Sequence, residues 1–313
     1  MGTHLVTGGA GFIGSHITEA LVKRGDAVRV LDNFATGRKE NLAGFEDKIT
    51  LIRGDLNDPD ALAEATNSVD VIYHLAALPS VPRSVDDPIG SNRANVDGTV
   101  ALLWAAKNAQ ARRVVYSASS SAYGDSPHFP RVETLLPEPL SPYAVAKLAG
   151  EYYCRAFWEC YGLETIGLRY FNVFGPRQNP ESQYAAAIPL FITAILEDRS
   201  PTVYGDGEQS RDFTYIENVV QANLRAAEAP KEACGKVFNT ACGQSVTVNE
   251  TIAAINRILG KNVPSVFAPP RPGDVKHSNA DISLARKLLD YEPTVMFEEG
   301  LERTMEYFRA SVR

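Results

Sequence analysis

The sequence lacks the residue patterns that would place it in several common protein classes. It has four cysteines in 313 residues, and none of them forms a C-x-x-C pair or a zinc-ligand spacing, so we expect no disulfide framework and no metal site. Basic residues are outnumbered, since 31 lysines and arginines stand against 38 aspartates and glutamates, for a net charge of -7. Because a polyanion needs a positive surface, we expect no nucleic-acid partner.

Long apolar runs are also missing. No segment approaches the ~18 to 20 consecutive apolar residues that span a bilayer, and the chain enters a strand at once instead of a signal peptide. We therefore expect a cytoplasmic protein with no membrane partner. The chain does have 44% hydrophobic residues and exceeds the length at which one core usually stops growing. Two lobes of unequal size are the natural expectation.

The first half of the chain alternates apolar strands with helical patterns. Strands are predicted over residues 3–7, 27–31, 49–53, 69–75 and 113–117. Such alternation predicts an α/β fold with a doubly wound parallel (Rossmann) sheet, in which ligands bind beyond the carboxyl ends of the strands. We expect this sheet in residues 1–170, with a segment near 213–240 returning to it, and a smaller substrate-binding domain mainly in 171–313.

A glycine-rich turn, Gly8-Gly9-Ala10-Gly11-Phe12-Ile13-Gly14, follows the first predicted strand. Glycines at positions 8, 11 and 14 permit a tight turn, let backbone N–H groups approach a diphosphate, and let the following helix pack closely on the sheet. Glycine-rich turns also serve as plain connectors, so the pattern needs support from elsewhere in the chain.

Asp32 supplies that support. It lies 24 positions after Gly8, at the end of the second predicted strand, where a carboxylate accepts both ribose hydroxyls and repels a 2′-phosphate. We therefore predict NAD rather than NADP as the cofactor. The alternative for Asp32 is a helix cap or a turn residue, and Arg38 and Lys39 leave some tolerance for a phosphate.

Tyr143 and Lys147 lie four residues apart at the start of a predicted helix that Ser141 caps and Pro142 begins. An ammonium group near a phenol favours the phenolate, which can remove a proton from a sugar hydroxyl. Such a pair also occurs by chance on exposed helices. Upstream, the strand that ends near residue 117 runs into a serine-rich segment, which places Ser119 at the carboxyl end of the sheet.

Together these segments resemble the extended short-chain dehydrogenases/reductases, and within them the nucleotide-sugar 4-epimerases. The resemblance covers essentially the whole chain, and it includes His74-Leu75-Ala76-Ala77 and Leu168-Arg169-Tyr170-Phe171-Asn172-Val173-Phe174-Gly175-Pro176. It implies a catalytic triad of Ser119, Tyr143 and Lys147, with NAD retained between two half-reactions.

The motifs and the resemblance also predict two sets of binding residues. For NAD they are Gly8, Gly11, Phe12, Ile13, Gly14, Asp32, Asn33, Asp55, Leu56, Leu75, Ala76, Ala77, Tyr143, Lys147 and Tyr170. For a UDP-sugar they are Ser80, Ser119, Ser120, Ser121, Tyr143, Asn172, Ala187, Val203, Tyr204, Arg211, Arg271, Asp274 and Ser278. Asp55 is as plausible in a turn as at the adenine, and each arginine, taken alone, as plausible in a surface ion pair.

The predicted reaction is inversion at C4 of the sugar through a 4-keto intermediate. Related dehydratases and decarboxylases carry acidic residues after the catalytic hydroxyl residue, whereas this chain continues with Ser120 and Ser121. At the position that the resemblance links to the C2 substituent, the small Ser278 favours UDP-N-acetylglucosamine and UDP-N-acetylgalactosamine, with UDP-glucose and UDP-galactose as further substrates. Pro79 departs from that branch, which often has glycine there.

Two other functions stay open at this point. A UDP-glucuronate 4-epimerase would need hydroxyl donors at the sugar carboxylate, which residues 119–121 could supply. A nucleotide-sugar-binding protein without activity would typically have lost Tyr143 or Lys147, and both are present. Surplus apolar positions in predicted helices over 95–109 and 142–161 match the family's four-helix interface, so we expect a homodimer; the alternative is packing within one chain.

Overall fold

A parallel sheet of seven strands forms the centre of the larger part of the molecule. The computed structural model describes residues 2–180, 187–270 and 276–311. In spatial order the strands are β11 (Lys236–Thr240), β6 (Glu164–Tyr170), β5 (Arg113–Ser119), β4 (Val71–His74), β1 (Thr3–Thr7), β2 (Ala27–Asp32) and β3 (Ile49–Arg53). Every neighbouring pair is parallel. This confirms the predicted doubly wound fold.

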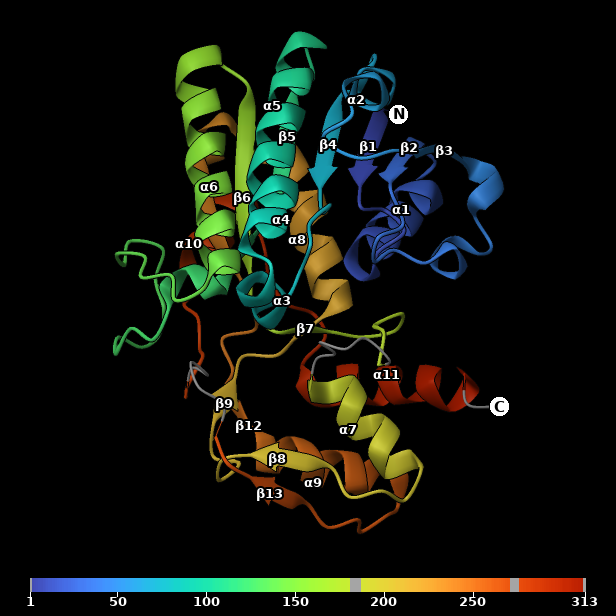
Figure 1. The fold of residues 1–313 in the computed structure, drawn as a ribbon, viewed down its shortest axis with the longest axis vertical. Helices are drawn as coiled ribbons and strands as arrows, with labels where there is room; N and C mark the ends of the chain where they lie inside the picture. The colour runs from blue at the N-terminus through green and yellow to red at the C-terminus, as the bar shows by residue number, and fades with distance from the viewer. Residues whose placement is uncertain (1, 181–186, 271–275, 312–313) are drawn as a thin grey trace.

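Helices cover both faces of this sheet (Figure 1). On one face α1 (Phe12–Arg24) packs against α8 (Ile216–Glu228). On the other face α5 (Gly98–Asn108) lies between α2 (Pro59–Thr66) and α6 (Pro142–Tyr161). Short helices α3 (Val81–Asp86) and α4 (Pro88–Asn92) pack against α6 near its first residues. The central strands β1, β4, β5 and β6 are buried on both faces, as their apolar runs in the sequence require.

The smaller part of the molecule, in the lower half of Figure 1, is built around short strand pairs and three helices. Its strand pairs are β7 (Val173–Phe174) with β10 (Thr214–Tyr215), β8 (Thr202–Tyr204) with β13 (Val266–Ala268), and β9 (Ser210–Arg211) with β12 (Val246–Thr247). The helices are α7 (Ala187–Leu196), α9 (Val248–Leu259) and α11 (Phe297–Ser311). The further helix α10 (Ser283–Leu289) contacts α8 and β11 of the larger part.

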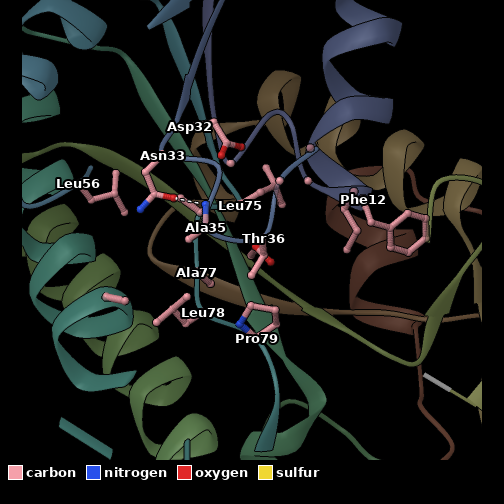
Figure 2. Close-up of a pocket in the computed structure, with 18 of the residues that line it drawn as sticks. Phe12, Asp32, Asn33, Ala35, Thr36, Leu56, Leu75, Ala77, Leu78 and Pro79 are labelled. Carbon is pink, nitrogen blue, oxygen red and sulfur yellow. Dashed lines mark hydrogen bonds between the residues drawn. The ribbon is translucent and has the colours of Figure 1, made fainter. Parts of the chain in front are cut away.

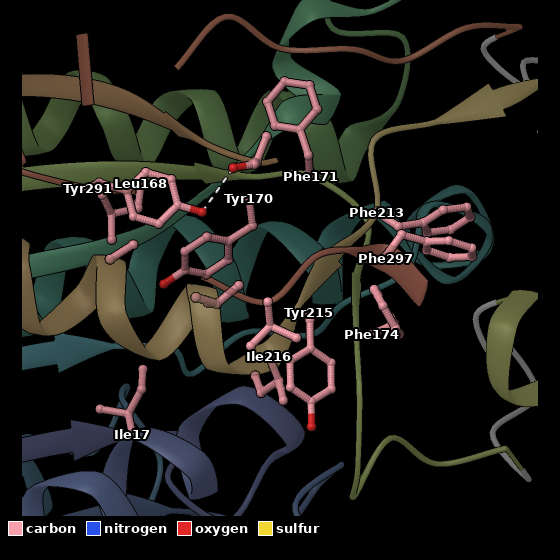
Figure 3. Close-up of a cluster of buried hydrophobic side chains, with 14 of the residues drawn as sticks. Ile17, Leu168, Tyr170, Phe171, Phe174, Phe213, Tyr215, Ile216, Tyr291 and Phe297 are labelled. Carbon is pink, nitrogen blue, oxygen red and sulfur yellow. Dashed lines mark hydrogen bonds between the residues drawn. The ribbon is translucent and has the colours of Figure 1, made fainter. Parts of the chain in front are cut away.

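One hydrophobic core runs through both parts. Figure 3 shows Ile17 of α1 and Tyr170 of β6 in the same cluster as Phe174, Phe213 and Phe297 of the smaller part. The rings of Phe213 and Phe297 stack with centroids 5.3 Å apart. A second core, on the opposite face of the sheet, lies under α2, α5 and α6. Because the first core contains residues from both parts, close packing fixes the two parts relative to each other on either side of the cleft.

One predicted helix begins differently in the structure. The pattern over residues 95–109 predicted a single helix, but residues Arg93–Asp97 form a π-helical turn and α5 starts at Gly98. Asn95 lies in this π-helical turn, and its side chain makes two hydrogen bonds to the backbone of Leu78. Oδ1 accepts from the Leu78 N–H, and Nδ2 donates to the Leu78 carbonyl oxygen. π-turns of this kind often mark functional sites.

Candidate functional site

A cleft of about 340 Å³ opens at the carboxyl ends of the parallel strands. All fifteen residues predicted to contact NAD line it. Figure 2 shows Phe12 at the start of α1, Asp32 and Asn33 at the end of β2, and Leu75 and Ala77 after β4. Separate crossovers of the chain bring these residues together. The position agrees with the rule that ligands of doubly wound sheets bind beyond the strand ends.

The glycine turn in this cleft fits a diphosphate. Gly8 has a φ of +69°, and a Cβ there would lie 2.7 Å from the backbone nitrogen of Ala76. A Cβ at Gly14 would lie 2.1 Å from the carbonyl oxygen of Gly8, so the helix packs directly on the turn. Gly11 caps α1 without a side chain, which leaves the first N–H groups of the helix facing an anion site.

Asp32 is a turn residue that also lines the cleft. Its Oδ2 accepts from the Ala10 backbone nitrogen at 2.9 Å, and its Oδ1 accepts from Phe34 at 2.8 Å, which makes it a turn residue. It also lines the cleft, where burial raises the pKa of the carboxyl group and the two N–H donors lower it. A Cβ at Gly37 would lie 2.8 Å from Oδ1, so little space surrounds this carboxylate.

Asp55 likewise combines a turn with a place in the cleft. Its oxygens accept from the backbone and side chain of Asn57 and, at 2.6 Å, from Asn33 Nδ2. Asn33 in turn accepts from the backbone of Ala35, as the dashed line in Figure 2 shows. The two loops after β2 and β3 are thus joined at the edge of the cleft.

Ser119, Tyr143 and Lys147 meet in the same cleft. Lys147 is 4% exposed, and its Nζ donates to the carbonyl oxygen of Ser117 at 2.7 Å. Ser119 and Tyr143 both line the cleft, and the Ser119 side chain lowers the pKa of the Tyr143 phenol. Ser121 donates to Ser119 Oγ twice, through its hydroxyl at 2.8 Å and its backbone nitrogen at 3.2 Å. Because Ser119 accepts both, its own hydroxyl proton is free to be donated.

The ionisation of the pair follows from burial. Desolvation raises the pKa of Tyr143 to about 12, although the Ser119 side chain lowers it. Desolvation also lowers the pKa of Lys147 to about 8, while Cys154 and Glu151 act in the opposite direction. A phenolate therefore needs further positive charge in the cleft, and the oxidised nicotinamide ring of NAD carries such a charge.

A second cavity, of about 320 Å³, lies in the smaller part of the molecule. Asn172 and Val173 line both cavities, so the two adjoin. Four of the predicted substrate residues contribute to its wall, namely Asn172, Ala187, Tyr204 and Arg211. Asn172 has a φ of +34° and donates through Nδ2 to the Asp212 carbonyl oxygen at 3.3 Å.

Five other predicted substrate residues that the structure describes line neither cavity. The Val203 side chain is 1% exposed and packs in the core beside its cavity-lining neighbours. Ser278 is half-buried, and its backbone nitrogen donates to the Ser210 carbonyl oxygen. Ser80, Ser120 and Ser121 lie in segments next to lining residues. Arg271 and Asp274 lie outside the described residues.

The structure adds lining residues that the sequence did not assign to NAD or to the substrate. In the first cleft they include Ala35, Thr36, Gly37, Leu78 and Pro79, all in loops that follow strands of the sheet. Following each of those loops further along the chain would have found them. Ala94 and, in the second cavity, Gln209 and Phe213 had no comparable signal, because only the tertiary fold brings them to the wall.

Two further surveys of the structure bear on site type. Across residues 2–180, 187–270 and 276–311, no helix combines the length and the apolar character of a bilayer crossing. Within the same described part of the chain, His, Cys, Asp and Glu side chains do not gather in threes as a metal ion would require.

The geometry can be compared with known proteins. A family model described as the NAD dependent epimerase/dehydratase family matches residues 4–241. The chain belongs to this family. Membership confirms the predicted resemblance, NAD as the cofactor, and an enzyme of the epimerase type.

Relatives within the family span the full length of the chain. A UDP-glucose 4-epimerase from Mycolicibacterium smegmatis is 40% identical over 311 residues, which cover 97% of this chain and 98% of the relative. The structure of a UDP-N-acetylglucosamine 4-epimerase from Methanobrevibacter ruminantium M1, in complex with UDP-N-acetylmuramic acid, is 43% identical with a TM-score of 0.95, covering 99% of each chain. A UDP-glucuronic acid 4-epimerase from Bacillus cereus, in complex with UDP-glucuronic acid and NAD, is 36% identical with a TM-score of 0.91, again over 99% of each chain.

Proposed function

We propose that this enzyme inverts C4 of a UDP-sugar through a 4-keto intermediate, with NAD as a retained cofactor. The observation that carries the proposal is the junction of the two cavities. The cleft with Ser119, Tyr143 and Lys147 adjoins, at Asn172 and Val173, the cavity that contains Arg211. A sugar beside the triad can therefore be joined to a nucleotide diphosphate in the second cavity, where a guanidinium suits phosphate.

The three side chains divide the acid/base work. The Tyr143 phenolate removes the proton from the C4 hydroxyl, and the Ser119 hydroxyl donates a hydrogen bond to the same oxygen. The Lys147 ammonium stabilises the phenolate by its positive charge. A hydrogen bond from Nζ to the Ser117 carbonyl oxygen holds the ammonium in place. NAD, when bound, supplies the hydride acceptor and donor at C4. Tyr143 would return the proton to the same C4 oxygen once the other face of the sugar ring is turned toward the cofactor, which completes the inversion.

The carboxylates of the cleft favour epimerisation over loss of water. Among the described residues that line it, only Asp32 and Asp55 are acidic, and they follow β2 and β3 at one edge of the sheet. Ser119 lies on β5, on the other side of β1 and β4. Among the described residues that line the cleft, no acidic group therefore lies next to Ser119 and Tyr143 to assist an elimination, and reduction is the step that remains.

UDP-N-acetylglucosamine and UDP-N-acetylgalactosamine are the proposed pair of substrates, with UDP-glucose and UDP-galactose also accepted. Ser278, the residue that the family resemblance links to the C2 substituent, has a small side chain, and the relative with 43% identity acts on UDP-N-acetylglucosamine by its description. UDP-glucuronate is the second candidate, because the hydroxyls of Ser119 and Ser121 lie together and a glucuronate epimerase is 36% identical.

Incubation with each of the three UDP-sugars, without added reductant, tests both parts of the proposal. We expect UDP-N-acetylglucosamine to give its C4 epimer, identified by NMR of the product. Turnover of UDP-glucuronate alone would overturn the substrate choice. Tyr143→Phe should retain NAD binding, measured by calorimetry, yet lose at least about 100-fold in kcat. Full activity of that variant would overturn the acid/base assignment.

We also propose a homodimer formed through α5 and α6. Trp104 of α5 and Val145, Tyr152 and Tyr161 of α6 are large apolar or aromatic side chains that are 48 to 57% exposed. Several such side chains on one pair of packed helices favour a protein interface.

A further inference from the structure

Helix α3 lies between the cleft and the helix that carries Tyr143. It follows directly on Leu78 and Pro79, which line the cleft, and it packs against α6. Ser84, near its end, is 1% exposed. Its Oγ donates to the Val81 carbonyl oxygen at 2.7 Å and accepts from the backbone nitrogen of Tyr143 at 3.0 Å. One buried hydroxyl therefore joins α3 to the proposed acid/base residue itself.

The first turn of α6 explains why this contact matters. A helix begins with N–H groups that have no partner within the helix. Pro142 has no N–H, and Ser141 satisfies the two residues after Tyr143, through its Oγ to Ala144 and its carbonyl oxygen to Val145. The N–H of Tyr143 is the remaining donor, and its acceptor comes from 59 residues earlier in the chain. The cap at this position is supplied by another helix.

The other end of the segment is held just as firmly. Asn95 makes two hydrogen bonds to the backbone of Leu78, at 2.8 and 3.1 Å. Ser80 has a φ of +101°, a value that a side chain rarely adopts, and its Oγ caps α3 by accepting from Arg83. Strained backbone persists only where its surroundings fix it, and here these contacts do so.

We propose that Ser84 is a positioning residue for the reaction, setting the place of the Tyr143 phenol against the cleft by holding its backbone N–H. This inference rests on the proposed function, because it assumes that Tyr143 is the acid/base. Ser84 touches no reacting atom. Its effect comes through geometry, to which proton and hydride transfer are steeply sensitive.

Ser84→Ala tests the inference directly. We expect kcat to fall about 10- to 100-fold while KM changes less than about threefold, because the substrate walls keep their side chains. Ser84→Thr keeps the hydroxyl and should recover most of kcat. A matched control is Thr251→Ala, which removes another fully buried hydroxyl, one bonded to Thr247 in α9 of the smaller part, and should leave kcat unchanged.

The results separate failure of this inference from failure of the proposed function. If Tyr143→Phe is inactive but Ser84→Ala keeps kcat within twofold of the parent enzyme, Ser84 does not position the tyrosine. If Tyr143→Phe is fully active, the acid/base assignment on which this inference rests fails, whereas a parent enzyme that epimerises none of the three UDP-sugars would overturn the proposed function. Thermal unfolding and NAD binding are measured for each variant. Should Ser84→Ala not fold, Ser84→Cys replaces it, and a kcat equal to that of Ser84→Thr would overturn the proposal.

Discussion

At the scale of single residues, Asp32 holds the backbone of the glycine-rich turn and is also the residue that we expect to bind the cofactor ribose. The carboxylate holds two backbone N–H groups and is 6% exposed, so its position is set before any ligand arrives. A Cβ at Gly37 would lie 2.8 Å from Oδ1, so a side chain at that position would displace the carboxylate. We expect the negative charge of Asp32 to repel a 2′-phosphate and so to favour NAD over NADP.

Removing that carboxylate should therefore weaken NAD binding. We expect Asp32→Ala to raise the Kd for NAD roughly 10-fold or more, since hydrogen bonds to a charged group are lost. Calorimetric titration measures it, with Asp47→Ala, an exposed carboxylate outside the cleft, as the control. An unchanged Kd in Asp32→Ala would contradict the assignment.

His74 makes a second prediction, on pH and stability. Its ring lies between Thr7 and Thr99, bonded to both at 2.8 and 2.9 Å, and burial lowers its pKa to about 3, with a further contribution from the charge of Lys147. An unfolded histidine titrates near 6.5. Between these two values the unfolded chain binds the extra proton, so stability falls as the pH drops from 6.5 toward 3.

We expect the contribution of His74 to this slope to approach about 1.4 kcal/mol per pH unit. Urea unfolding at a series of pH values measures it. The slope should be smaller in His74→Gln, whereas His128→Gln, which changes an exposed histidine, should keep the parent slope. Equal slopes in all three proteins would show that His74 does not titrate as its burial requires.

At the scale of elements, a buried ion pair fastens α6 to β6. Glu151 lies two turns beyond Tyr143 on α6, and it binds Arg169 of β6 through two hydrogen bonds of 2.9 and 2.7 Å. Both side chains are 3% exposed, and the guanidinium lies 4.6 Å from the centre of the Tyr123 ring. The pair sets where α6 sits on the sheet, and so where its catalytic face points.

Breaking this pair on one side leaves a buried charge. Arg169→Met should lower the free energy of unfolding by about 3 to 5 kcal/mol, because Glu151 would lose its partner away from water. The exposed pair of Arg257 and Glu298 is the comparison, and Arg257→Met should leave stability unchanged within error. Chemical unfolding of both variants measures the two changes in the free energy of unfolding. Equal decreases in the two variants would show that burial does not make the pair of Glu151 and Arg169 more important than the exposed pair.

At the scale of the whole molecule, the exposed aromatic face of α5 and α6 bears on assembly. Light scattering should give the mass of two chains. Trp104→Glu combined with Tyr152→Glu should give the mass of one chain, since charge is costly in an apolar interface. Leu51→Glu, at an exposed apolar residue on the edge strand β3, is the control and should leave the mass unchanged. A monomeric parent enzyme would rule the interface out.

Much of the fold and the cofactor site is determined by the sequence itself. Three local patterns carry this information. The glycine spacing predicts the tight turn, the position of Asp32 at the end of a strand predicts a carboxylate at the edge of the sheet, and the spacing of Tyr143 and Lys147 predicts that they share one helix face. The order of strands and helices, read in the same way, was enough to predict the parallel sheet and the place of the cleft.

The tertiary structure alone decided the contacts between distant segments. Ser84 reaches Tyr143 across 59 positions, Asn95 holds Leu78 from a π-turn, and Asn172 joins the two cavities. No sequence spacing predicts these contacts, because each depends on how the helices and loops between the strands pack against one another in the folded chain. The proposed pair of Tyr143 and Lys147 can therefore be predicted from the sequence. The contacts that position this pair, such as the one from Ser84, form only in the folded structure, because they join residues that are distant in the chain.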